Sequence, residues 1–277
     1  MKKHKILIII LTIVLVVYCI VIAYLNSNYH YSKLLLNAII DENELQVREI
    51  LEKKPKCVNV YPTLASEGWQ SLMDQSIGYP LVEACYTGNI EIIKLLVENG
   101  ADVNLGARFT PLSFTYNQKP QNWYSISIYL LENGASLDYK THYAYGNVLI
   151  DIVEGRPGSM SVKYGIENNE EVIKAFRYAL ENCDHSNVNW MRVLQHSVTN
   201  DRIEIVKLLL DEKCCDVNDN SIGMTALMFA ARDSTPEMIQ LLLDYGADKN
   251  CKSNEGKTAY DYAVEFDRKD NIPLLEN

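Results

Sequence analysis

The chain has 277 residues, 48% of them hydrophobic, and a formal net charge of −10. Three basic residues, Lys2, Lys3 and Lys5, precede a long apolar segment, so 23 of the 26 basic side chains and all 36 acidic ones lie in residues 26–277. A field of that sign disfavours nucleic acid as a ligand and favours a protein with a basic face. The alternative is that the acidic surface only keeps the domain soluble.

Residues 6–25 contain no charge, and fifteen of these twenty residues are Ile, Leu or Val. Twenty helical residues span about 30 Å, the thickness of the bilayer hydrocarbon. A cleaved signal peptide is the alternative, but its apolar core is usually only about 7–15 residues and ends in a small-x-small site, which residues 23–27 lack. The segment therefore predicts one uncleaved transmembrane helix, although cleavage stays open.

The basic residues before the span place the N-terminus in the cytoplasm by the positive-inside rule, and everything after the span outside it. No N-x-Ser/Thr sequon follows the span, which favours a bacterial periplasm. We therefore expect a single-pass protein of the inner membrane, with residues 1–30 as its anchor and residues 31–277 as a periplasmic domain. About five residues should separate the span from the first helix, and Tyr18, Tyr24, Tyr29 and Tyr31 should form an aromatic belt at the outer interface.

Residues 79–104 are typical of one helix–turn–helix unit. Pro80 suits the first position of a helix, Gly88 interrupts the helical pattern, and Gly100 suits the left-handed residue after a second helix. The sequence Asn-Gly-Ala-Asp-Val-Asn at 99–104 recurs as Asn-Gly-Ala-Ser-Leu-Asp at 133–138 and as Tyr-Gly-Ala-Asp-Lys-Asn at 245–250. The opening Thr-Pro-Leu at 110–112 recurs as Thr-Ala-Leu at 225–227 and as Thr-Ala at 258–259.

This period near 33 residues, with T-P-L-x-x-A and G-A-D-x-N, resembles the ankyrin repeat. The resemblance implies an all-α ankyrin-repeat solenoid of about six to seven helix–turn–helix repeats, with degenerate middle repeats, preceded by one N-terminal transmembrane helix. The family's Thr-Pro-Leu-His histidine is replaced by Val82, Ser113 and Met228. That substitution implies looser coupling between neighbouring turns, and the role of residues 155–169, a long polar loop, is left open.

No motif of a phosphate-binding loop, a zinc protease or a serine hydrolase is found, so we expect no enzyme, no catalytic residue and no cofactor. Cys183 and His185 offer only two metal ligands, so no metal site is expected. Six cysteines follow the span, an even number that permits disulfides in an oxidising compartment. Their redox state stays open: Cys57, Cys85, Cys183, Cys214, Cys215 and Cys251.

Ankyrin proteins bind other proteins, so the candidate site is a set of aromatic and polar residues in insertions, at turn tips and on the inner helices. Tyr, Trp and Arg dominate interface hot spots, and insertions in repeat arrays often map to the binding face. For each residue, packing within the array is the competing interpretation. The candidates are Trp69, Tyr79, Phe114, Tyr116, Trp123, Tyr124, Tyr143, Tyr145, Gln195, His196, Met228 and Arg232.

The chain also resembles bacterial membrane-anchored or periplasmic ankyrin proteins. Some of these are immunity proteins that neutralise a secreted toxin, such as a phospholipase effector of a type VI system. The resemblance implies an inhibitor whose partner is a secreted effector with a basic face. The alternative is a membrane-tethered envelope scaffold or stress-protection factor with several weaker partners. Oligomeric state is not determined by the sequence.

Overall fold

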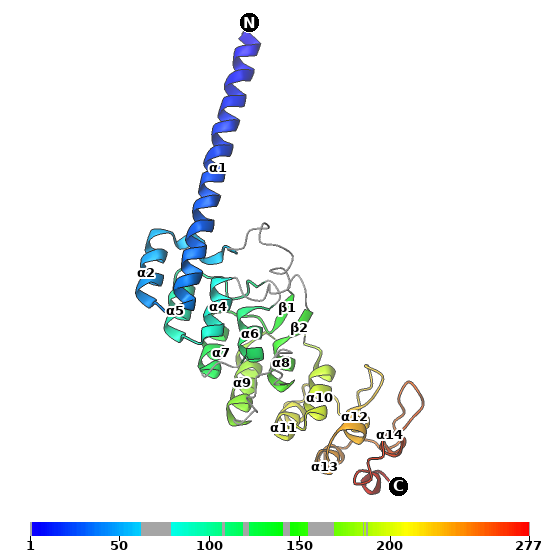
Figure 1. Cartoon of the computed structure of the whole chain (residues 1–277). Helices are drawn as coiled ribbons and strands as arrows, with labels where there is room; N and C mark the ends of the chain where they lie inside the picture. The colour runs from blue at the N-terminus through cyan, green and yellow to red at the C-terminus, as the bar shows by residue number, and fades with distance from the viewer. Residues whose placement is uncertain are drawn as a thin grey trace. The chain divides into compact units, whose positions relative to one another are not determined.

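The computed structural model describes residues 2–61, 79–106, 109–118, 122–140, 145–154, 169–184, 186 and 188–276. The chain forms two compact units. The N-terminal unit holds residues 1–115, 119–135 and 141–144, and the C-terminal unit holds residues 116–118, 136–140 and 145–277. Figure 1 labels most of the helices and both strands.

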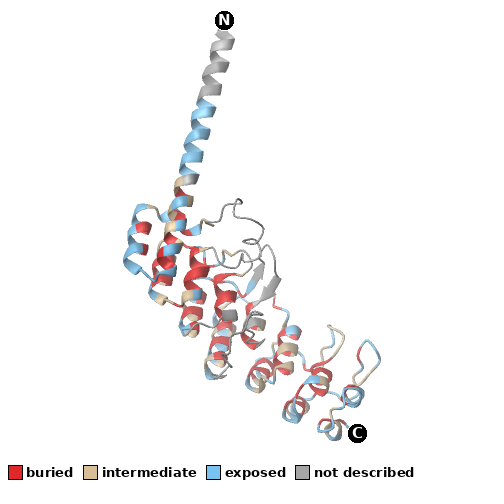
Figure 2. Ribbon diagram, in the orientation of Figure 1, coloured by how far each residue is buried: buried red, intermediate tan, exposed pale blue. Residues whose placement is uncertain are grey.

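A single helix, α1 (Lys2–Ile40), contains both the predicted span and the first helix of the first repeat. Of its described side chains, those of residues 13–25 are exposed, whereas those of Ser32, Leu35, Ala38 and Ile39 are buried. Figure 2 shows the change from exposed to buried along this helix. The helix is long and apolar enough to cross a membrane, a property that a signal sequence shares. The expected spacer after the span is wrong, because residues 26–30 continue the helix without a break.

This continuity also corrects the expected aromatic belt. Tyr18 and Tyr31 are thirteen residues apart on one straight helix, or about 20 Å along its axis. An interfacial layer of a bilayer is only about 5–8 Å thick, so these two rings do not lie at one depth. Tyr24 is the tyrosine that lies at the end of the predicted span.

The rest of the N-terminal unit consists of helices stacked in pairs. Their bounds are α2 (Glu44–Lys53), the 3₁₀ helix η1 (Pro55–Asn59), α4 (Pro80–Thr87), α5 (Ile90–Glu98), α6 (Pro111–Gln118, whose last three residues belong to the C-terminal unit) and α7 (Trp123–Glu132). The pair α4 and α5 follows the sequence prediction closely. Pro80 begins α4, Gly88 ends it at φ 78°, and the Asn89 side chain caps α5 by accepting from two backbone N–H groups.

The C-terminal unit begins with a short antiparallel hairpin and continues as helix pairs. Strands β1 (Asp138–Lys140) and β2 (Tyr145–Asn147) pair with Asp138 opposite Asn147. The helices are α8 (Val148–Glu154), α9 (Asn169–Asn182), α10 (Trp190–Thr199), α11 (Ile203–Asp211), α12 (Ala226–Asp233), α13 (Pro236–Asp244), α14 (Ala259–Glu265) and α15 (Ile272–Leu275). The predicted helical solenoid is confirmed, and the two three-residue strands are an addition that the sequence did not predict.

Asparagine side chains link three of the described turns to the next repeat. Asn59 Nδ2 donates to the Gly100 carbonyl at 2.8 Å, and Asn59 Oδ1 accepts from the Asp102 N–H at 2.9 Å. Asn218 makes the same pair of bonds to Gly246 and Asp248, at 3.0 and 2.8 Å. Asn104 Nδ2 bonds the Gly134 carbonyl at 3.0 Å. The missing histidines therefore do not leave these turns uncoupled, because asparagine supplies the link.

A second set of bonds joins the opposite ends of the helix pairs in the C-terminal unit. Asp201 has φ 52° and accepts hydrogen bonds from the Ser234 hydroxyl and from the Thr235 N–H and hydroxyl. The Asn271 side-chain amide donates to the Ala231 and Ser234 carbonyls, both at 3.2 Å. Neighbouring repeats of this unit are thus held together at both ends of their helices.

Candidate protein-binding surface

For three of the twelve candidate residues, the position of the side chain is not described. Trp69 and Tyr143 lie outside the described residues. Tyr145 lies in β2, where its backbone pairs with Lys140. The loop 155–168 is also outside the described part of the chain. For these positions the binding role remains a prediction.

Four candidates are part of the core, which corrects the expectation that they face a partner. Phe114 and Met228 are 2% and 1% exposed, Tyr116 is fully buried, and Trp123 is almost so. Met228 Sδ also accepts from the Thr225 N–H at 3.4 Å and so helps to cap its own helix. An inner helix packs against both neighbouring repeats, so residues at several of its positions are covered.

The side chains of the remaining candidates are partly exposed to solvent. Tyr79 is half-buried before α4 with its ring 5.1 Å from that of Tyr61, and burial raises the pKa of its hydroxyl. Tyr124 is half-buried at the start of α7, edge-on to Trp123 at 6.0 Å. Gln195 and His196 are half-buried on α10. These residues remain available for contact.

The Arg232 side chain forms an ion pair and lies near two aromatic rings. Its guanidinium donates to Asp233 Oδ2 through Nη2 at 2.7 Å and Nε at 2.9 Å. The guanidinium carbon lies 5.4 Å from the ring centre of Phe229 and 5.8 Å from that of Phe266, within range of cation–π attraction. Phe266 is half exposed. We call Phe229, Arg232 and Phe266 the Arg232 cluster. Phe229 is buried, so the cluster exposes Phe266 and part of Arg232, and arginine is enriched in interface hot spots.

Two exposed aromatic side chains on inner helices were missed by the sequence analysis. Tyr86 on α4 is 52% exposed, with its ring 6.2 Å from that of Phe114, which in turn lies 5.9 Å from Phe109. Tyr260 on α14 is 38% exposed, and it occupies the helix position that Leu227 holds, buried, on α12. The repeat register gives no signal for Tyr260, because the equivalent Leu227 is buried.

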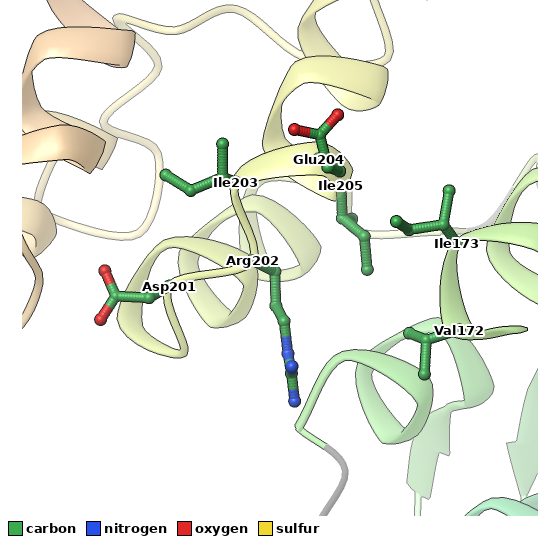
Figure 3. Close-up of a pocket in the computed structure, with 7 residues that line it drawn as sticks. All are labelled: Val172, Ile173, Asp201, Arg202, Ile203, Glu204 and Ile205. Carbon is green, nitrogen blue, oxygen red and sulfur yellow. The ribbon is translucent and has the colours of Figure 1, made fainter. Parts of the chain in front are cut away.

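A small hollow of about 180 Å³ lies inside the C-terminal unit, between α9 and the start of α11 (Figure 3). Ile173 and Ile205 point toward one another across it, whereas Asp201 points away. Arg202 at its edge donates through Nε to the Val153 carbonyl at 3.0 Å, and burial lowers the pKa of its guanidinium. The hollow is smaller than the roughly 300–1,000 Å³ of small-molecule sites, and the residues that line it include no nucleophile paired with a base.

In the described part of the chain, the cysteines and acidic residues do not gather at one place. All seven cysteines are described, and each is a free thiol. Burial raises the pKa of the Cys57 thiol to about 11 and that of Cys85 to about 12. Within the described ranges, no three His, Cys, Asp or Glu side chains gather as metal ligands would.

Comparison with known proteins identifies the repeats. The family described as "Ankyrin repeats (3 copies)" matches residues 161–253 and 194–277, and the family "Ankyrin repeat" matches residues 79–108. Together these matches cover more than half of the chain. The Regulatory protein NPR6 of Arabidopsis thaliana is 32% identical over 109 residues, which is 35% of this chain and 23% of the relative. The chain spans about a quarter or less of the length of the first curated relatives it matches.

Among solved structures, the human ASB11 ankyrin repeat domain has a TM-score of 0.61 and 25% identity, over 88% of this chain and 97% of that one. A chain from the complex of the Predatory Endopeptidase Bd0816 of Bdellovibrio bacteriovorus with immunity protein Bd3460 covers 88% of this chain and 96% of its own length. Its TM-score is 0.44 and its identity is 22%. That second likeness is too distant to bear on function.

Proposed function

Because this chain belongs to the ankyrin-repeat family, we propose that it binds and neutralises a secreted antibacterial toxin while held at the outer face of the inner membrane. The Arg232 cluster carries the proposal. Arg232 is oriented by Asp233 and lies near the rings of Phe229 and Phe266, and arginine is one of the residue types enriched in interface hot spots. Ankyrin solenoids offer long concave surfaces that bind proteins.

Two further observations support the compartment and the kind of partner. The uncharged segment 6–25 follows Lys2, Lys3 and Lys5, and it lies in a helix that runs directly into the first repeat. This order favours a cytoplasmic N-terminus and a periplasmic domain. The excess of 36 acidic over 23 basic side chains after the span favours a toxin with a basic face.

The test is capture of a partner by the full-length chain in mild detergent, compared between two arginine variants. Arg232→Ala removes the centre of the cluster, whereas Arg177→Ala removes an exposed arginine from α9. We expect one partner with nanomolar affinity, weakened about tenfold or more by Arg232→Ala and unchanged by Arg177→Ala. A deletion strain should then be killed by toxin-producing siblings. Survival of that strain would refute the immunity role.

The second candidate is a membrane-tethered envelope scaffold or stress-protection factor. The observation that favours it is the presence of exposed aromatic side chains in both units, Tyr86 in one and Tyr260 in the other, since separate surfaces suit several partners. It predicts several micromolar partners in the same capture experiment and no toxin among them.

A further inference from the structure

In the N-terminal unit, the segment after α2 returns to the point where the predicted span ends. The 3₁₀ helix η1 packs along α1, and the Ser32 hydroxyl donates to the Val60 carbonyl at 2.5 Å. Lys56 Nζ lies 5.8 Å from the ring centre of Tyr24, and Lys54 is also within electrostatic reach of that side chain. Residues thirty positions apart in the sequence are therefore neighbours in the fold.

This returning segment is basic. Lys53 and Lys56 are exposed and Lys54 is half-buried. We call these three residues the basic rim. The sequences 2–40 and 53–61 contain no carboxylate side chain, although the chain as a whole carries −10. The acidic residues nearest in sequence, Glu49 and Glu52, are exposed on α2.

The fold also fixes the depth of Lys56 within the basic rim. Tyr24 is the last residue but one of the apolar segment 6–25, so it lies where the hydrocarbon ends if the segment spans a bilayer. Headgroup layers are about 5–8 Å thick on each side, and Lys56 lies 5.8 Å from the Tyr24 ring. Because α1 has no break between Tyr24 and its buried residue Ser32, this level does not depend on a flexible linker.

We propose that the basic rim binds the headgroups of anionic phospholipids in the leaflet from which α1 emerges, and so seats the N-terminal unit on the membrane surface. The inference rests on the proposed membrane span and adds to it a lipid preference. A lysine close to an anionic leaflet changes membrane partitioning by about fivefold. Tyr24 at the same level adds an aromatic side chain of the kind that is enriched at membrane interfaces.

The test uses the full-length chain in lipid nanodiscs, one set zwitterionic and one containing anionic phospholipid. Each set is treated with an amine-acetylating reagent, and the modification rate of each lysine is read by mass spectrometry. Lys94, which pairs with Glu91 at 2.9 Å on α5, serves as the internal reference. We expect anionic lipid to slow modification of Lys53, Lys54 and Lys56 severalfold relative to Lys94, and high salt to restore the rates.

A double variant, Lys54→Gln with Lys56→Gln, separates lipid binding from a general change in accessibility. In this variant, Lys53 should be modified at the same rate in both lipid sets. Equal rates in the unaltered chain would overturn the lipid inference while leaving the span intact. Resistance of the chain to alkaline carbonate extraction from membranes tests the span itself, and release by carbonate would overturn both.

Discussion

Replacing Glu83 with glutamine should remove a pH dependence from the stability of the N-terminal unit. Glu83 lies on α4 with its side chain 4% exposed, and its Oε2 has no hydrogen-bond partner. Burial raises the pKa of this carboxyl from 4.5 to about 7. The folded chain therefore keeps this proton over a pH range in which the unfolded chain has lost it.

The sign of the effect follows from that difference. Below about pH 4.5 the carboxyl is neutral in both states, and burial of the ionised form carries no penalty. As the pH rises from 4.5 to 7, the unfolded state ionises first and stability falls by about 1.4 kcal/mol for each pH unit. Above pH 7 the loss is complete, at about 3 kcal/mol as an upper bound. Glutamine has nearly the same shape and no charge, so Glu83→Gln should lack this loss.

The measurement is thermal unfolding of the full-length chain in detergent from pH 5 to 8, with Glu49→Gln, an exposed residue of α2, as the control. The gain in Tm of Glu83→Gln over the unaltered chain should be small at pH 5 and reach roughly 6–12 °C at pH 8. Glu49→Gln should follow the unaltered chain. A Tm difference that is the same at every pH, or a Glu83→Gln variant less stable at pH 8, would refute the reasoning.

Three further outcomes are expected. Asn218→Ala removes both bonds that link its turn to the next repeat and should cost about 1–3 kcal/mol in urea unfolding, whereas Asn220→Ala, at an exposed position of the same turn, should cost little. Cys85, fully buried with its pKa raised to about 12, should resist alkylation at pH 8 until urea is added, and rapid labelling of the native chain would contradict its placement. Gly106→Ala should destabilise more than Gly134→Ala in thermal unfolding. A Cβ at 106 would lie 1.8 Å from the Phe109 carbonyl oxygen, whereas at 134 it meets nothing within 4 Å and costs only the strain of φ 87°, about 1 kcal/mol.

The repeats were predictable because their signals are local. Pro80 and Gly88 act on the backbone where they stand. Of the apolar stripe that the spacing predicts at Ile90, Ile93, Leu96 and Val97, the two central residues are fully buried and the two outer ones are half-buried. Coupling between turns was predicted less well. The missing histidine suggested loose turns, but the side chains of Asn104 and Asn218 each bond a carbonyl some thirty residues further along the chain. Such a bond is visible only once the repeats are stacked.

The binding surface was harder to predict, because an inner helix has one face toward each neighbouring repeat and one toward the groove. Phe114 and Met228 were placed in the groove and are buried instead. Tyr260 shows the reverse case. Leu227, at the same position of α12, is buried, whereas the side chain of Tyr260 on α14 is 38% exposed. The same helix position is therefore core or surface depending on what stacks beside it, and a single sequence carries no such information.

The lysines of the basic rim bear on how topology is inferred from charge. The positive-inside rule counts residues close to the span in sequence, and Lys33 is the only lysine or arginine soon after residue 25. That count does not include Lys53, Lys54 and Lys56, because they are too far from the span in sequence. In the folded chain, however, Lys56 lies beside Tyr24. The two facts act at different times, because the rule governs insertion of the unfolded chain, whereas the basic rim forms only after α2 and η1 have packed on α1. The proposed lipid contact of the basic rim is therefore compatible with the orientation that Lys2, Lys3 and Lys5 predict, because the rim forms only after insertion.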